Sequence, residues 1–392
     1  MALRIEGGNV LLPEGLATID LMLDHGRIAG IGSTRPSRIL PGLTPPGLTP
    51  ISRTFDARGL HVLPGIVDLH GDAFERQMQP RPGVPFPTAL AFRETERQLL
   101  ANGITTAFHA VTLGWEPGLR GANAWRTTLD VLAAGTWSCD MRVHMRWELH
   151  NLDALPTALA DVAAGRVGMV TFNDHTPEIV RKLEIPEKAA AFSARAGIPA
   201  PELRAMAAHA LSRTPEVPAA ANRLAAAAHA AGIPVASHDD ATIATRHHYR
   251  ALGARVCEFP MAQAVGEDAR DHGEPVVMGC PNVVRGGSHL GWAGAGALAE
   301  QGIATILCSD YFYPAMTAAA LRLASGLLGL ARAWALISAN PAIAAGLHDR
   351  GCIALGLRAD LVLLDSGTGE VVATVCEGRV AYAGTEGWAR MG

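Results

Sequence analysis

Side chains that bind metal ions stand at the ends of several short apolar runs in this 392-residue sequence. The first run ends with His70 and Asp72, which are two positions apart and therefore share one face of an extended strand. Glu148, His238 and Asp310 end later runs in the same way. Imidazole and carboxylate groups together are typical ligands of zinc, manganese and iron. The pattern therefore predicts a site for one or two divalent metal ions (Zn, Mn or Fe).

Two further candidate ligands are His175 and Glu258. His175 lies in a polar stretch that precedes Pro177, and Glu258 stands between apolar neighbours, where a buried carboxylate needs a metal or another cation as its partner. Taken singly, each candidate has a structural explanation, as a helix cap or as half of an ion pair. Such residues at six strand ends are hard to explain by structure alone. The predicted metal ligands are therefore His70, Asp72, Glu148, His175, His238, Glu258 and Asp310.

The apolar runs that carry these residues alternate with Ala-rich helical stretches, which indicates βα units and a parallel sheet. Eight strands are predicted, at residues 65–70, 105–111, 141–149, 169–173, 234–238, 255–259, 275–278 and 305–308. Helices are predicted at residues 88–102, 125–134, 155–164, 218–231, 240–252 and 291–301, with a last helical region at 317–344. This α/β pattern favours a (β/α)8 TIM barrel over residues 61–350, with an open doubly wound sheet as the alternative. Barrel enzymes carry their catalytic groups at the carboxyl ends of the strands, where the candidate ligands stand.

Both ends of the chain have a different pattern, that of short strands separated by turns. The strands are predicted at residues 3–5, 9–12, 19–23, 27–31, 360–364, 371–376 and 379–383. Residues 40–50 are rich in Pro, Gly and Thr, which predicts a loop. We expect residues 1–60 and 351–392 to form one small β-sandwich domain.

The composition excludes several classes of protein. Hydrophobic residues make up 49% and charged residues 18% of the chain, as in a globular protein with a large core. The net charge of -4 gives no basic field for nucleic acid, so we expect a small-molecule partner. No CxxC pair, leader peptide or membrane span is recognisable, and we expect a cytoplasmic protein that does not bind membranes. The large apolar fraction is compatible with a homodimer.

The sequence resembles the amidohydrolase superfamily at both borders of the predicted barrel. Residues 63–70, Leu-Pro-Gly-Ile-Val-Asp-Leu-His, are similar to its first-strand signature, and residues 357–362 to the return into its β domain. The superfamily more often has a second His where this chain has Asp72. Asp72 and other motifs resemble instead the PhnM family, the α-D-ribose 1-methylphosphonate 5-triphosphate diphosphatases of the carbon–phosphorus lyase pathway. These motifs are residues 70–72, 80–83, 174–177, 237–240, 258–260, 281–289 and 309–311.

This resemblance implies a metal-dependent diphosphatase of phosphonate metabolism. Bound metal, with Glu148 as a bridging ligand, would lower the pKa of a water, and Asp310 would accept its proton as the general base. Attack at phosphorus would release pyrophosphate and leave the 5-phosphate. Residues 73–76 and 178–182 differ from the family pattern. Phosphoryl oxygens need cationic partners. The candidate substrate-binding residues, all in predicted loops at the barrel mouth, are Arg81, Lys182, Arg285 and His289.

Two other functions stay open at this point. The same metal site could hydrolyse a cyclic amide or an N-acyl amino acid, which would need one cation for a carboxylate but no cluster of cations. The barrel could also be a non-catalytic phosphonate-binding protein, although such a binder would not need Asp310 as a base. Measured turnover separates these functions from the diphosphatase.

Overall fold

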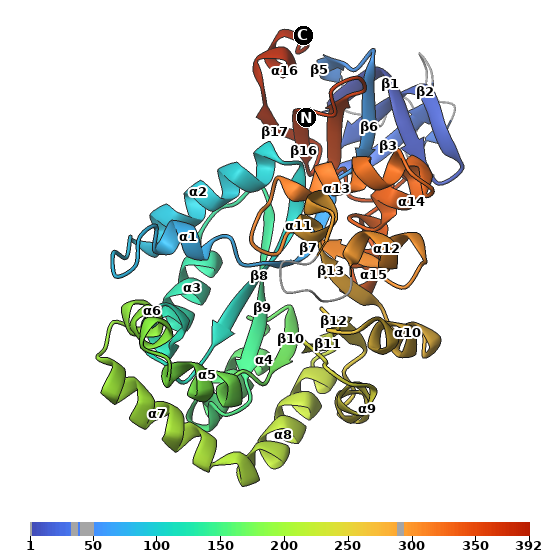
Figure 1. Cartoon of the computed structure of the whole chain (residues 1–392). Coiled ribbons are helices and arrows are strands. Elements are labelled where there is room, and N and C mark those ends of the chain that lie inside the picture. The colour runs from blue at the N-terminus through green and yellow to red at the C-terminus, as the bar shows by residue number, and fades with distance from the viewer. Residues whose placement is uncertain (1, 33–37, 40–50, 288–293) are drawn as a thin grey trace.

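An eight-stranded parallel sheet forms the centre of the computed structural model, which describes residues 2–32, 38–39, 51–287 and 294–392 (Figure 1). Each strand pairs with the next one along the chain, in the order β14-β13-β12-β11-β10-β9-β8-β7. The strands are β7 (Ile66–Gly71), β8 (Ile104–Leu113), β9 (Asp140–Glu148), β10 (Met169–Asn173), β11 (Val235–His238), β12 (Val256–Glu258), β13 (Val276–Gly279) and β14 (Ile306–Cys308). All eight strands predicted from the sequence are therefore confirmed.

The first and last strands of this sheet meet, which curls it into a barrel. Gly71 and Asp310 form a parallel bridge, the amide of Asp72 donates to the carbonyl of Asp310 (2.8 Å), and the amide of Asp310 donates to the carbonyl of His70 (2.9 Å). The buried carboxylate of Asp68 accepts bonds from the amide (2.9 Å) and hydroxyl (2.5 Å) of Ser309. These bonds rule out the open doubly wound sheet.

Helices follow the barrel strands and surround them (Figure 1). Those that match the sequence prediction are α2 (Thr88–Ala101), α3 (Ala122–Ala134), α4 (Leu155–Ala163), α8 (Val217–Ala230), α9 (Ile243–Ala251) and α12 (Ala295–Glu300). The predicted last helical region consists of three helices, α13 (Ala315–Ala324), α14 (Gly329–Ala335) and α15 (Ala339–Ala344). Residues 291–293 of one predicted helix lie outside the described residues.

Several helices were not predicted. They are α1 (Glu75–Met78), α5 (Thr176–Leu183), α6 (Pro186–Ala196), α7 (Ala200–Ser212), α10 (Gln263–Asp271) and α11 (Cys280–Arg285). Four of them begin at or next to a proline, as at Pro186 in α6 and Pro201 in α7. Proline is well tolerated in a first helical turn but has the same sequence signal as a loop.

Both ends of the chain build a second, mixed sheet of nine strands, as expected for the small β unit. Its order is β17-β16-β15-β6-β1-β2-β3-β4, and β5 also pairs with β1. Strand β15 runs antiparallel to β6, with Leu361 opposite Pro64, and this pairing joins the two ends. The strands are β1 (Ala2–Leu12), β2 (Gly15–Asp24), β3 (Arg27–Gly32), β4 (Arg38–Ile39), β5 (Ile51–Asp56), β6 (Leu60–Pro64), β15 (Leu361–Asp365), β16 (Val371–Cys376) and β17 (Arg379–Ala383), and a short helix, α16 (Thr385–Ala389), follows. The predicted loop at residues 40–50 lies outside the described residues.

The barrel interior is apolar over most of its length and polar at one end. Residues such as Val67, Phe108 and Met169 fill it as one buried cluster. Because side chains alternate along a strand, Val143, Met145 and Trp147 of β9 pack among the apolar residues of the surrounding helices. The residues between them, at positions 144, 146 and 148, lie on the opposite face of β9, which is the polar wall of the site. No helix of the described residues is long and apolar enough to span a membrane.

Candidate metal centre

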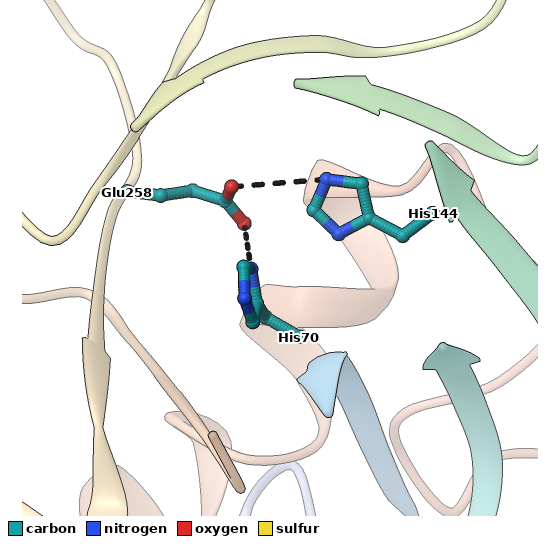
Figure 2. Close-up of side chains that lie close together, drawn as sticks. All are labelled: His70, His144 and Glu258. Atoms are coloured by element: carbon teal, nitrogen blue, oxygen red, sulfur yellow. Dashed lines mark hydrogen bonds and ion pairs between the residues drawn. The ribbon is translucent and has the colours of Figure 1, made fainter. Parts of the chain in front are cut away.

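The deepest part of the site is a buried cluster of His70, His144 and Glu258 (Figure 2). Nδ1 of His70 lies 3.2 Å from Oε1 of Glu258, and Nε2 of His144 lies 3.7 Å from Oε2. All three side chains are at most 1% exposed. Burial lowers the pKa of His70 well below its ordinary value and that of His144 to about 4, so both imidazoles are neutral near pH 7.

The hydrogen bonds around this cluster hold its rings in fixed orientations. Nδ1 of His144 donates to the carbonyl of Leu69 (3.0 Å), so its Nε2 faces the hydroxyl of Thr171 at 2.6 Å. The same hydroxyl lies 2.9 Å from Oε2 of Glu258. Glu258 accepts from Nδ1 of His70, and a carboxylate in that position is the usual way to orient a metal-binding imidazole. This arrangement leaves Nε2 of His70 as the nitrogen that could bind a metal.

A second cluster, nearer the barrel mouth, consists of His175, His238 and Asp239. Oδ2 of Asp239 lies 3.0 Å from Nδ1 of His238 and 3.3 Å from Nε2 of His175. Burial alone would raise the pKa of the Asp239 carboxyl, but the two histidines lower it below the ordinary range. The rings of His70 and His238 lie 5.3 Å apart between centroids, so the two clusters adjoin.

Asp72 and Asp310 stand side by side where the barrel closes. Burial, together with the neighbouring Glu75, raises the pKa of Asp72 to about 6, and burial with the charge of Asp72 raises that of Asp310 to about 7. A pKa raised in this way means that the carboxylate lacks sufficient positive charge nearby. A divalent cation would supply that charge, so the donor set fits a metal ion.

Arg146 of β9 is the cation that lies within this group of acidic and imidazole side chains. Its Nη2 is 3.2 Å from Nε2 of His238, and its Nη1 is 3.7 Å from Oδ2 of Asp72. The Arg146 side chain is 8% exposed. Neither Arg146 nor His144 was among the sequence-predicted site residues. Their signal was the alternation along β9, which puts both on the polar face with Glu148.

Glu148 has a different environment from the other predicted ligands. Its Oε1 accepts bonds from the amides of His175 (3.0 Å) and Thr176 (2.9 Å) and from the hydroxyl of Thr176 (2.7 Å). It therefore caps the amino end of α5, which donates three bonds to this one oxygen. The other oxygen, Oε2, lies 3.7 Å from Nδ1 of His175, and its assignment as a bridging ligand stays a prediction.

Backbone strain is concentrated at the same strand ends. Five non-glycine residues of the described chain have a positive φ, and three of them lie at or just after barrel strands: Asp239 (58°), Phe259 (52°) and Asp310 (55°). Such a conformation costs roughly 1–3 kcal/mol for each residue and persists where the surroundings enforce it, typically at functional sites. Here it turns the carboxylates of Asp239 and Asp310 out of their strand direction.

The predicted substrate-binding residues lie further out. Arg81 is exposed in a turn in which it pairs with Val84, and Arg285 is exposed at the end of α11. Lys182 forms an ion pair with Glu178 one turn away on α5 (2.7 Å). His289 lies outside the described residues.

A cation that was not predicted lies next to the site. Arg76 follows Asp72 in the short helix α1, and its charge acts on that carboxylate. The guanidinium lies 5.8 Å from the ring centroid of Tyr311, the residue after Asp310. Arg76 is exposed, so its donors can reach a solute at the mouth of the barrel.

This chain is similar to known proteins both in sequence and in fold. The amidohydrolase family model matches residues 184–381. The alpha-D-ribose 1-methylphosphonate 5-triphosphate diphosphatase of Escherichia coli (strain K12) is 34% identical over 328 residues, which cover 80% of this chain and 85% of that protein. Among solved structures, molinate hydrolase superposes with a TM-score of 0.63 at 13% identity, over 97% of this chain and 94% of that one. The β-aspartyl dipeptidase of Fervidobacterium islandicum AW-1 gives 0.62 at 14% identity, over 98% and 97%.

The two solved structures show a shared fold at this level of identity. The family model takes in half of the chain, including the strands that carry His238, Glu258 and Asp310. The E. coli protein is similar along four fifths of it. This chain is therefore a hydrolase of the amidohydrolase family and belongs, within it, to the family of the E. coli diphosphatase.

Proposed function

We propose that this hydrolase cleaves α-D-ribose 1-methylphosphonate 5-triphosphate to the 5-phosphate and pyrophosphate, as a step of phosphonate catabolism. The similarity to the E. coli diphosphatase over 80% of the chain carries the choice of substrate. The partly buried carboxylates Asp72 and Asp310, near His70 and His238, support a metal-dependent hydrolysis. The six free cysteines are typical of a reducing compartment, and we place the enzyme in the cytoplasm.

The metal-binding residues in this proposal are His70, Asp72, His238 and Asp310, with His175, Glu148 and Glu258 as further candidates. One or two divalent ions (Zn, Mn or Fe) held there would supply Lewis acidity and would lower the pKa of a water toward neutrality. Asp310 accepts a proton from the attacking water as the general base, since it stands beside Asp72 where the barrel closes. Neutral imidazoles at His70 and His238 keep their nitrogen lone pairs available for a cation.

Cations at the barrel mouth bind the triphosphate in this proposal. Arg76 lies four residues after Asp72, and its guanidinium is 5.8 Å from the ring centroid of Tyr311, the residue after Asp310. An arginine fork suits phosphoryl oxygens. Arg81 and Arg285 are exposed and bind the outer phosphates in this proposal. His289 lies outside the described residues and stays a candidate from the sequence. Lys182 would first have to leave Glu178, a surface pair of small energy.

Release of pyrophosphate from the ribosyl triphosphate, with added Mn²⁺ or Zn²⁺, tests this function. Wild type should release one pyrophosphate for each substrate. Asp310→Asn should lower kcat by about 10²–10⁴-fold, the usual contribution of a general base. Asp271→Asn, a change of the same kind at the exposed end of α10, should have wild-type kcat.

Three results would contradict the proposal or part of it. Hydrolysis of amides without pyrophosphate release would support an enzyme that acts on a cyclic amide or an N-acyl amino acid. Tight binding of the triphosphate without turnover under any metal would support a phosphonate-binding protein. An unchanged kcat in Asp310→Asn would remove Asp310 as the base and leave the substrate assignment intact.

A further inference from the structure

Among the residues that the structure describes, the guanidinium of Arg146 has two polar side-chain contacts, and both are with predicted metal ligands. Nη2 contacts His238 at 3.2 Å and Nη1 contacts Asp72 at 3.7 Å. Arg146 is buried, and its Nε has no hydrogen-bond partner among the residues that the structure describes. A guanidinium of this kind is not a surface ion pair, because it lies inside the barrel among carboxylates and imidazoles.

The contact with His238 engages the atom that a metal would need. A guanidinium only donates hydrogen bonds, so Nε2 of His238 must be the acceptor and must direct its lone pair at Arg146. A neutral ring that accepts at Nε2 has its proton on Nδ1, which lies 3.0 Å from Oδ2 of Asp239 but outside hydrogen-bond geometry. A metal ion that binds this tautomer uses the same Nε2 lone pair, because Nδ1 carries the proton.

The contact with Asp72 likewise engages a carboxylate that a metal ion would need. Other cations act on Asp72 from a distance, namely Arg76 and Arg120. Arg120 is held by both oxygens of Glu75, at 2.9 Å each, so its charge is largely balanced. Arg146 therefore supplies the closest positive charge to Asp72 among these three, in the position that a cation between Asp72 and His238 would take.

We propose that Arg146 and a metal ion compete for Asp72 and His238. In the metal-free protein the guanidinium holds both ligands in place, and metal binding requires it to leave. This inference rests on the metal-binding part of the proposed function and is independent of the substrate. Binding of a metal and binding of the guanidinium are then coupled reciprocally, and removal of the guanidinium should tighten metal binding on the order of tenfold.

Isothermal titration calorimetry of the metal-stripped full chain with Mn²⁺ and with Zn²⁺ measures this coupling without substrate. Arg146→Met should bind the metal about tenfold more tightly than wild type. Arg97→Met, with the same loss of charge on the exposed face of α2, should have the wild-type Kd. Arg146→Lys keeps the charge but loses the planar fork, and its Kd should fall between those of wild type and Arg146→Met.

An equal or weaker affinity in Arg146→Met would overturn the competition and would make Arg146 a support of the loaded site. A second readout does not depend on the variant's folding: in a crystal structure of the metal-loaded wild type, Arg146 must no longer contact Nε2 of His238. A guanidinium that stays there beside a bound metal would also overturn the inference. Failure of wild type and Arg146→Met alike to bind metal would contradict both this inference and the proposed metal dependence, whereas equal, measurable affinities would contradict the inference alone.

Discussion

At the scale of single residues, three neighbouring carboxyl groups at the closing edge of the barrel have a raised pKa. Asp68 is fully buried, and Asp72 and Asp310 are partly buried. Burial raises the pKa of Asp68 and Asp72 to about 6 and that of Asp310 to about 7. In the metal-free protein, bound protons neutralise part of the carboxylate charge that a divalent cation would otherwise neutralise.

Metal binding should therefore depend steeply on pH. Asp72 and Asp310 are largely protonated at pH 5.5 and largely ionised at pH 8, because their pKa values lie above the ordinary value of 3.8. A metal must displace these protons, so its affinity should fall as the pH drops through 7 and 6. Calorimetric titrations at several pH values, in buffers of different ionisation enthalpy, would give both the Kd and the number of protons released. A Kd that stays constant from pH 8 to 5.5 would contradict this competition between protons and the metal ion.

A second prediction at this scale concerns Arg76. If its guanidinium binds a phosphoryl oxygen, Arg76→Gln should raise KM for the triphosphate about tenfold, since a hydrogen bond from a charged group contributes roughly 1.5–3 kcal/mol. The value of kcat should change little, because Arg76 is exposed and lies outside the buried clusters. Steady-state kinetics with Arg97→Gln as the control measures both constants. An unchanged KM would place the phosphates elsewhere in the mouth.

At the scale of elements, the strand ends position the side chains. Asp310 is fixed by the hydrogen bond from its backbone amide to the carbonyl of His70 and by its positive φ. Its side chain also lies against Gly279 at the end of β13. A Cβ on Gly279 would lie 3.0 Å from Oδ2 of Asp310, closer than ordinary contact. Gly279 has φ −76° and ψ 129°, which alanine adopts freely, so only the contact with Asp310 opposes a side chain there.

Gly279→Ala should therefore impair the chemistry more than the fold. We expect kcat to fall about tenfold or more, as for other small displacements of a catalytic group, with a melting temperature within a few degrees of wild type. Gly296→Ala in α12 is the matched control, because a Cβ there meets nothing within 4 Å. Wild-type kcat in Gly279→Ala would show that Asp310 can move without loss.

At the scale of the whole molecule, the two sheets share one core. Leu63 of β6 and Val362 of β15 belong to the same buried apolar cluster as Ile66 and Ile104 of the barrel. The indole of Trp334 donates to the carbonyl of Pro64 (2.9 Å), and β7 begins two residues after β6 ends. Elements that share a core in this way unfold together.

Calorimetric unfolding should accordingly give one transition for both sheets. Arg358→Met tests the joint, because Arg358 pairs with Asp360 (2.8 Å) and Glu377 (3.3 Å) of the nine-stranded sheet and lies 3.8 Å from Asp140 of β9. Loss of this guanidinium leaves Asp360 buried with less compensation and should lower the free energy of unfolding by roughly 2–3 kcal/mol. The variant should still unfold in one step. A separate low-temperature transition of the nine-stranded sheet would contradict the shared core.

The sequence by itself determined the architecture of this protein. Apolar runs of strand length, alternating with helices, placed all eight barrel strands, and the spacing of His70 and Asp72 predicted a site at the strand ends. These features are local: a strand pattern and the residue after it depend on neighbours in the chain. The helices that begin at or next to a proline, such as α6, were not predicted, because proline at that position is also typical of a loop.

The tertiary structure alone decided how the site residues are grouped. Residues from β7, β9 and β12 form one buried cluster, and residues at or after the ends of β10 and β11 form another. The sequence had offered His70, His175, His238 and Glu258 as a single set and had not offered His144 or Asp239. Glu148 proved to cap α5, and Arg146 proved to lie between Asp72 and His238. These contacts depend on which strand ends face one another across the closed barrel. Packing between residues far apart in the chain sets that arrangement, so it cannot be inferred from the spacing of residues in the sequence.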